Sequence, residues 1–333
     1  MKIKLSLPRH WGAQPTISPF IERDGSFRGH ELFVDSERSE ADAWVVFDEV
    51  NPDDNICMVP PNRTFFVTAE SVWAEDHWLS HQRSEFLRQF AQVRSSHISS
   101  HPHFRATPPF LPWMVHGNHG STWTPNSLDL QALRVAQPPE KRFALSVICS
   151  SKARHPGHNV RLDFVRRLKD HFGESLHWFG NGVNPIETKW EGLAPYMATI
   201  AIENHIRPDL YTEKLLDPFL TWTIPIYAGA TNAKDYFDIP DEWLIDMRDF
   251  NKSVEGIERL LESGTDRSGK AALEANRSKV LGEAHFLARV VSMVGEVADG
   301  LAPKLLSFSG FSQKKIRRSP GDRALDALRA LIS

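Results

Sequence analysis

Two polar side chains stand at the end of an apolar run in the middle of the chain. The run Thr199–Ile202 is suited to a buried strand, and it ends in Glu203 and Asn204, where a core strand would carry no charge. Thr212 then offers a helix N-cap, with Lys214 in the first turn behind it. A lysine there opposes the helix dipole, so the position is poor for stability unless an anion shares the space. The pattern predicts an anion-binding site between a strand end and a helix start.

Residues 196–229 supply the elements that would position this site, because they read as one βαβ unit. Pro208 and Asp209 break the chain after the first strand, a helix begins near residue 213, and Ile224–Tyr227 is a second strand. In an open parallel sheet, ligands bind outside the carboxyl ends of the strands, where helix N-termini attract anions. The crevice would gather cations, carboxylates and an amide, a mixture that favours a sugar nucleotide over bare phosphate: Glu203, Asn204, Arg207, Tyr211, Glu213 and Lys214.

The same letters carry a family resemblance. The pair EN, seven residues, TEK, a helix and IPIYAG together resemble the signature of glycosyltransferase family 10, the α-1,3/4-fucosyltransferases that use GDP-fucose. The resemblance implies an α/β protein of GT-B architecture, with two Rossmann-like doubly wound domains facing a cleft. It implies an inverting enzyme that moves fucose from GDP-fucose to a hydroxyl of an acceptor oligosaccharide or glycolipid, with an α-1,3 linkage. A related glycosyltransferase with another nucleotide sugar stays open, as does a non-catalytic carbohydrate-binding protein on this fold.

The diphosphate contacts follow from the resemblance. NVRLDF is similar to the family's arginine-then-aromatic element, whose arginine contacts the diphosphate, and that role falls to Arg161 in a helix expected from Asn159 to Phe172. Lys214 is the second implied diphosphate cation, and Asn204 matches the family asparagine. No Asp-x-Asp motif occurs in the sequence, which favours protein cations and helix dipoles over a metal ion. No metal site and no cofactor are expected besides the donor substrate.

Three further residues are implied donor contacts. Glu213 matches the family glutamate that binds the fucose or the ribose, and Lys189 also has a family counterpart. Tyr211 departs from the pattern, because the family commonly reads Tyr-Val-Thr-Glu-Lys and the tyrosine here is shifted by one position.

Glu70 is the predicted general base. It follows the strand TFFVT through Ala69, at the carboxyl end of a strand in the first half, and the family has a glutamate after a comparable strand. An ordinary glutamate titrates near pH ~4.3, and partial burial beside aromatic residues would raise its pKa toward the range useful for a base. His116 and His119 are rival bases, because histidine titrates near neutrality.

Length and alternating strand and helix patterns predict two domains. The chain has 333 residues, and Pro125–Lys141 reads as a linker. We expect an acceptor-binding domain over 1–140, a nucleotide-sugar domain over 141–303, and a basic, amphipathic tail over 304–333. The expected strands lie at 1–7, 43–47, 64–68, 143–149 and 176–179, besides the two of the βαβ unit, with helices near 253–262 and 268–299.

Charge and cysteine content bound the partners and the compartment. A net charge of −3 argues against a general nucleic-acid binder. Cys57 and Cys149 lie far apart, without metal or disulfide spacing, as in a reduced cytosolic protein. No secretory signal or membrane-spanning run is visible, so a cytoplasmic, bacterial-type enzyme is expected. The tail favours a solvated terminal helix, with peripheral contact at the inner membrane face as the alternative.

Overall fold

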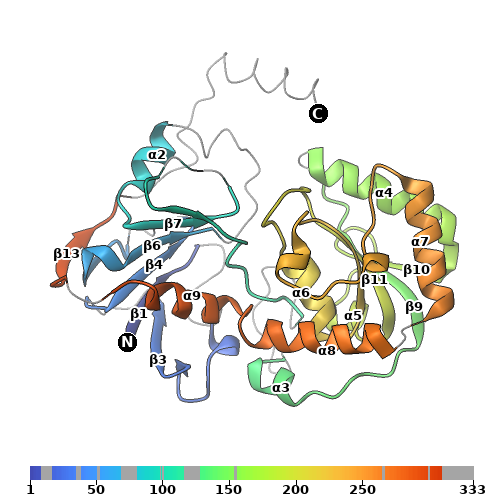
Figure 1. Cartoon of the computed structure of the whole chain (residues 1–333), viewed down its shortest axis with the longest axis horizontal. Coiled ribbons are helices and arrows are strands. Elements are labelled where there is room, and N and C mark those ends of the chain that lie inside the picture. The colour runs from blue at the N-terminus through green and yellow to red at the C-terminus, as the bar shows by residue number, and fades with distance from the viewer. Residues whose placement is uncertain are drawn as a thin grey trace.

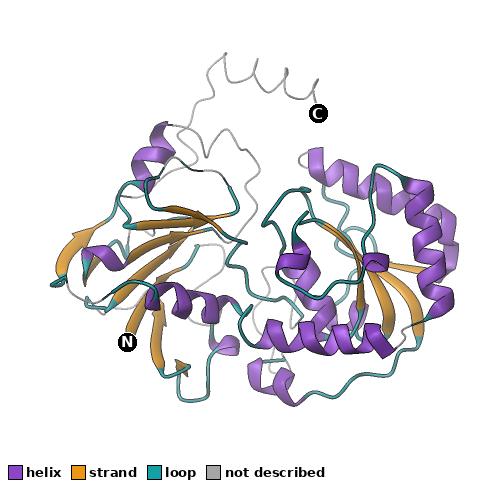
Figure 2. Cartoon of the chain, viewed as in Figure 1, coloured by secondary structure: helices purple, strands orange, loops and turns teal. Residues whose placement is uncertain are grey.

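The computed structural model shows two α/β halves lying side by side along the long axis of the molecule (Figure 1; Figure 2). It describes residues 1–8, 17–34, 39–50, 53–68, 81–97, 99, 101–115, 128–153, 156–264, 267–298 and 301–309. Glu70, His116, His119 and the segment 310–333 lie outside the described residues. Among the helices that are described, none is long and apolar enough to cross a membrane.

The first half is built on a seven-stranded sheet in the order β2-β3-β1-β4-β6-β7-β8. All its pairings are parallel except that of β2 with β3. The strand AWVVF of β4 is buried at every position, as expected of a central strand covered on both faces. The strands are β1 Lys2–Ser6, β2 Ser26–Phe27, β3 His30–Val34, β4 Ala43–Phe47, β6 Thr64–Val67, β7 Gln92–Ser95 and β8 Phe104–Ala106.

The second half holds a four-stranded, fully parallel sheet in the order β10-β9-β11-β12. Its strands, all predicted from the sequence, are β9 Phe143–Ile148, β10 Leu176–Phe179, β11 Tyr196–Ile202 and β12 Ile224–Ala228. The chain leaves β9 through α4 (Pro156–Phe172) to β10 on one side. It then returns through α5 (Lys189–Leu193) to β11 on the other side of β9, and α6 (Glu213–Leu220) leads on to β12. The topological switch point therefore lies between β9 and β11, where ligands bind in sheets of this kind.

The helix expected over 268–299 is wrong as one element. The chain instead forms two helices there, α8 (Arg267–Leu281) and α9 (Phe286–Gly295), whereas the helix expected near 253–262 is confirmed as α7 (Phe250–Ser263). The break follows Gly282, and His285 caps α9 by accepting from the Leu287 backbone N–H at 3.1 Å. In Figure 1, α8 runs beneath the second half and α9 lies with the strands of the first.

Packing of α9 and of a late strand changes the expected domain division. The Phe286 ring meets Phe20 edge-on at 5.1 Å, and the Arg289 guanidinium donates to the Pro109 carbonyl at 2.8 Å. Strand β13 (Lys304–Ser307) pairs antiparallel with β5 (Ile56–Val59). Residues 286–295 and 304–309 therefore belong with the first half by contact, although the sequence assigned them to the second domain and the tail. The apolar residues of α9 are buried nearly all round the helix, in a core cluster that contains residues of both halves.

Smaller elements complete the two halves. Helix α3 (Leu130–Val135) interrupts the expected linker, and α2 (His81–Leu87) lies inside the helix expected in the second half of 73–92. Short 3₁₀ turns cover Ser18–Phe20, Pro61–Arg63, Gly173–Ser175, Ala233–Asp235 and Asp241–Trp243. Leu244 makes only a single bridge to Tyr227 rather than a strand.

Lys141 makes the stability of the second half dependent on pH. Its Nζ donates to the carbonyls of Ala194 and Thr221 at 2.9 and 2.8 Å and to Thr223 Oγ1 at 3.0 Å. Burial lowers the pKa of Lys141 from 10.5 to about 7. Between these values the unfolded chain holds the proton and the folded chain releases it. The unfolded state thus binds more protons, and stability rises with pH across this window.

We expect the free energy of unfolding to increase by roughly 2 kcal/mol from pH 7 to pH 9 because of this one group. Lys141→Met should remove that slope, and urea denaturation of both proteins at the two pH values measures it. An equal slope in the variant would assign the pH dependence to other groups.

Candidate active site

Arg161 is brought to the carboxyl end of β9 by α4. The helix begins at Pro156, three residues before the predicted start, so Arg161 lies in the second turn rather than the first. Proline is favoured at a helix start because its missing N–H would have no partner there. The Arg161 side chain is 8% exposed, and its Nε has no hydrogen-bond partner among the described residues. A buried guanidinium nitrogen without a partner is costly, which suits a ligand site.

The end of β11 is fastened to the start of α6 through Glu203. Its buried carboxylate accepts from the Thr212 backbone N–H at 2.7 Å and from Thr212 Oγ1 at 2.9 Å. Thr212 in turn caps α6, as predicted, by accepting from the Lys214 backbone N–H. Burial raises the pKa of Glu203, the Lys214 charge lowers it, and the Glu213 carboxylate raises it again. Glu203 therefore supports the strand end, the role that the sequence favoured for it.

Gly229 follows β12, and its lack of a side chain leaves space for the Glu203 side chain. A Cβ at this position would lie 2.0 Å from Tyr227 Oη and 2.6 Å from Glu203 Cγ. Both neighbours are buried, so neither has space to move away. Position 229 of the IPIYAG stretch therefore requires glycine, because the Tyr227 and Glu203 side chains pack directly against its Cα.

Glu213 and Lys214 open α6 and contact each other. Lys214 Nζ lies 3.0 Å from Glu213 Oε1, 3.1 Å from Thr212 Oγ1 and 3.6 Å from Glu203 Oε2. The Lys214 side chain keeps 22% of its surface exposed, whereas that of Glu213 keeps 6%. The lysine that opposes the helix dipole is therefore held by carboxylates and still reaches solvent.

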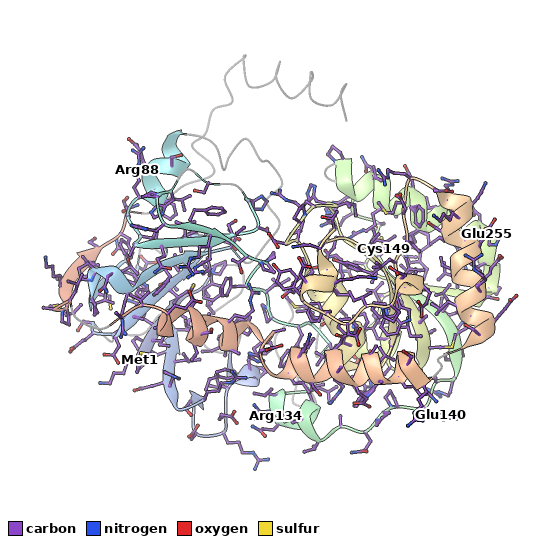
Figure 3. The ribbon with its side chains drawn as sticks, in the orientation of Figure 1. Met1, Arg88, Arg134, Glu140, Cys149 and Glu255 are labelled. Atoms are coloured by element: carbon purple, nitrogen blue, oxygen red, sulfur yellow. The ribbon has the colours of Figure 1, made fainter. Side chains whose placement is uncertain are left out.

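The Cys149 thiol lies near several cations, with Arg161 and Lys214 among them. Burial raises the pKa of the Cys149 thiol, while the charge of Arg161 and, more weakly, that of Lys214 lower it. Cys149 follows β9, and Figure 3 labels it within the second half, inside the ring of helices. Asn204 follows β11, the neighbouring strand at the switch point, and its Oδ1 is buried without a hydrogen-bond partner among the described residues. Unpaired donor and acceptor atoms are thus carried by the segments that follow two neighbouring strands, β9 and β11, near the N-termini of α4 and α6, which favour anions.

Comparison with known proteins identifies this half of the chain. Residues 139–268 match the family description Glycosyltransferase family 10 (fucosyltransferase) C-term. This stretch belongs to glycosyltransferase family 10. A 4-galactosyl-N-acetylglucosaminide 3-alpha-L-fucosyltransferase FUT6 from Pongo pygmaeus is 25% identical over 112 residues, which cover 33% of this chain and 31% of that protein. The match thus spans about a third of the curated relative.

Solved structures agree with the two-domain architecture. An alpha-glucosyltransferase in complex with UDP and a mismatched 13-mer DNA aligns with a TM-score of 0.50 at 12% identity, over 89% of this chain and 100% of that one. An alpha1,3-fucosyltransferase with GDP covers 90% of this chain and 92% of its own, with a TM-score of 0.49 and 17% identity. The expected α/β fold of GT-B type, with two Rossmann-like domains, is confirmed for this chain.

Two predicted donor contacts of the chain lie in its interior. The Tyr211 side chain is 3% exposed, and its ring meets Tyr236 and Phe237 edge-on at 5.2 and 5.1 Å. Lys189 Nζ lies 2.9 Å from Asp217 Oδ2 and 3.5 Å from Glu213 Oε1. The tyrosine is therefore surrounded by core rings and the lysine by carboxylates, and direct contact of either with a donor stays a prediction.

The predicted base Glu70 lies outside the described residues, as do its rivals His116 and His119. The strand before Glu70 does end at the edge of the first sheet that meets the second half. One residue after that strand, Thr68 Oγ1 donates to Ser95 Oγ at 3.1 Å. Two residues beyond Ser95, the His97 Nδ1 lies 3.1 Å from an Arg207 guanidinium nitrogen, and Arg207 also donates to the Ser96 carbonyl at 2.8 Å. The loops after β7 and β11 thus join the carboxyl edges of the two sheets.

Sequence reasoning missed two residues here. The sequence placed Arg207 at the end of β11 but did not indicate that its side chain contacts the first half. No pattern marks its partner His97. Asp217 was not singled out, although an aspartate in the apolar stretch EKLLDPFL is an available signal, because a buried carboxylate needs a partner.

Proposed function

We propose that this protein is an inverting fucosyltransferase that moves fucose from GDP-fucose to a hydroxyl of an acceptor glycan, with an α-1,3 linkage. The observation that carries the proposal is the position of Arg161 and Lys214 on the helices that follow β9 and β11, the two strands at the switch point, inside the stretch that matches family 10. The fucosyltransferase name of the Pongo relative supports the choice of sugar.

Arg161 and Lys214 would stabilise the departing diphosphate. In the transition state the bond between fucose C1 and the phosphate oxygen lengthens, and negative charge develops on that oxygen. The Arg161 Nε–H group, which has no hydrogen-bond partner among the described residues, is ready to donate to it, and the α4 and α6 N-termini add partial positive charge. These groups would do the work that a divalent ion does in other glycosyltransferases, and metal independence is part of the proposal.

Glu213 and Asn204 would hold the sugar and ribose hydroxyls. The Glu213 side chain is almost buried at the first position of α6, where a carboxylate is also favoured by the helix dipole. The Asn204 Oδ1 atom can accept from a hydroxyl.

Glu70 would act as the base. The acceptor oxygen attacks C1 from the face opposite the diphosphate, the carboxylate takes the hydroxyl proton, and GDP leaves. One displacement inverts the anomeric centre, so a β-linked donor gives an α-linked product. The acceptor would bind to the first half. The enzyme would work in the cytoplasm, and peripheral membrane contact by the tail stays a prediction.

The test combines binding and transfer. GDP should raise the melting temperature, and GDP-fucose with β-galactoside or N-acetylglucosamine acceptors should give a fucosylated product whose linkage and anomer are read by NMR. We expect transfer to persist in a chelator. Turnover of another nucleotide sugar in place of GDP-fucose would favour the related-glycosyltransferase alternative, whereas glycan binding without any nucleotide binding would favour a carbohydrate-binding protein.

A further inference from the structure

Five charged side chains form an alternating row through the second half. From the β11 end, the row runs from Glu203 to Lys214 at 3.6 Å, to Glu213 at 3.0 Å, to Lys189 at 3.5 Å and to Asp217 at 2.9 Å. Each cation lies between two carboxylates, and the most exposed side chain in the row is that of Lys214, at 22%. Buried charges are tolerated when they alternate in this way, because each compensates the next.

Glu213 is the shared member of the row. Its Oε1 atom lies within 3.5 Å of both Lys189 Nζ and Lys214 Nζ. Lys214 faces the crevice, whereas Lys189 approaches from the first residue of α5 on the interior side. The Lys189 ammonium therefore holds the Glu213 carboxylate from the interior side, and it does not need to contact a ligand to do so.

Asp217 fixes that ammonium in turn. Its Oδ2 atom binds Lys189, and its Oδ1 atom accepts from the Met114 backbone N–H at 2.7 Å. Met114 belongs to the segment that enters from the first half, and next to it the Val115 carbonyl accepts from the Trp190 N–H at 3.3 Å. The last member of the row, Asp217, is thus hydrogen-bonded to the backbone of the segment that connects the two halves.

The ionisation of the row depends on these contacts. Burial alone would lower the pKa of Lys189, but the carboxylates of Asp217 and Glu213 raise it above its ordinary value. Burial raises the pKa of Asp217 to about 6, although Lys189 opposes the shift. The Lys189 ammonium therefore stays charged beside the Glu213 carboxylate.

We propose that Lys189 and Asp217 are positioning residues that hold the Glu213 carboxylate in place for the sugar of the nucleotide sugar. This inference rests on the proposed function of Glu213. It assigns Lys189 a role through Glu213 instead of the direct donor contact expected from the sequence. The row then governs affinity for the sugar part of the donor, while Arg161 governs affinity for the diphosphate part.

The experiment compares two dissociation constants, for GDP and for GDP-fucose, by calorimetry without acceptor. Lys189→Met should leave the GDP constant within about twofold and weaken GDP-fucose binding about tenfold, the loss expected for one charge-assisted hydrogen bond. Glu213→Gln should act in the same direction. In the double variant the two effects should not multiply, because Lys189 acts only through Glu213.

Three further variants separate positioning from simple damage. Lys189→Arg keeps the positive charge and should retain most of the preference for GDP-fucose over GDP. Asp217→Asn keeps an oxygen that accepts from the Met114 N–H, but it loses the negative charge beside Lys189 and should lose part of that preference. Lys234→Met is the matched control, because Lys234 pairs with Asp241 on the exposed surface. If Lys189→Met does not fold, Asp217→Asn decides the question.

Equal weakening of GDP and GDP-fucose binding in Lys189→Met, or multiplying effects in the double variant, would overturn the inference. That result differs from failure of the proposed function, in which the unmodified protein itself binds neither GDP nor GDP-fucose.

Discussion

Replacing Arg161 by methionine is expected to weaken GDP binding by about 30-fold or more, the effect of removing one member of a buried charge pair. The reason is that the Arg161 guanidinium is nearly buried and its Nε has no partner among the described residues, so the diphosphate would be the group that compensates it. Calorimetric titration with GDP at fixed ionic strength measures the change. Arg248→Met is a suitable control, because Arg248 pairs with Asp246 on the surface and its side chain is 91% exposed.

The stability of the same variant gives an independent readout. A buried cation whose Nε–H group is unsatisfied among the described residues costs stability in the unliganded protein, so Arg161→Met should keep or raise the melting temperature while GDP binding falls. The Cys149 thiol offers a second readout, since loss of the Arg161 charge should raise its pKa further. Weakened GDP binding together with a clear loss of stability would indicate a structural role for Arg161 instead.

The sheet of the second half could be predicted because its strands carry strong local signals. The runs FALSVIC and TIAI are apolar and β-branched, and each ends in polar or small residues. The switch point follows from strand order, and with it the meeting of Arg161 and Lys214. Parallel sheets bring every carboxyl end to one edge, so side chains far apart in sequence, such as Arg161 and Asn204, fall into one crevice.

The residues that escaped prediction are those whose surroundings depend on long-range packing. Helix α9 has the same periodic pattern as α8, and only the core that receives Phe286 tells that it joins the first half. Strand β7 was not predicted, and the helical spacing of Phe86 and Phe90 just before it gives no sign that a strand begins. The partner of Lys189 is Asp217, 28 residues away, and no local pattern connects the two.

Tyr211 illustrates the same limit inside the family signature. The shift by one position was visible in the sequence, but its consequence was not. The loop before α6 turns at Asp209, whose φ is 59°, and Asp209 is held there by the Asn232 side chain, to whose Oδ1 its N–H donates at 2.8 Å. After that turn, Tyr211 enters the core beside Tyr236. A signature can therefore fix the positions of Glu213 and Lys214 while leaving the side chain between turn and cap to tertiary packing.

Glu70→Gln is expected to lower the rate of fucosyl transfer by about 100- to 10,000-fold, the range that a positioned general base contributes. The amide has nearly the same shape as the carboxylate but cannot take the acceptor proton. The GDP dissociation constant should stay within about twofold, because the cations proposed to bind the diphosphate, Arg161 and Lys214, lie in the second half. Steady-state transfer with saturating donor and acceptor, beside GDP calorimetry, measures both quantities.

The two rival bases supply matched comparisons. His116→Gln and His119→Gln should each retain transfer within about tenfold if Glu70 is the base, since neither then takes the proton. The match to family 10 covers residues 139–268 and does not reach residue 70, so this experiment tests the first half independently of the donor site. Full transfer by Glu70→Gln together with a collapsed rate in one histidine variant would move the base to that histidine, and the nucleotide-binding role of the second half would stand unchanged.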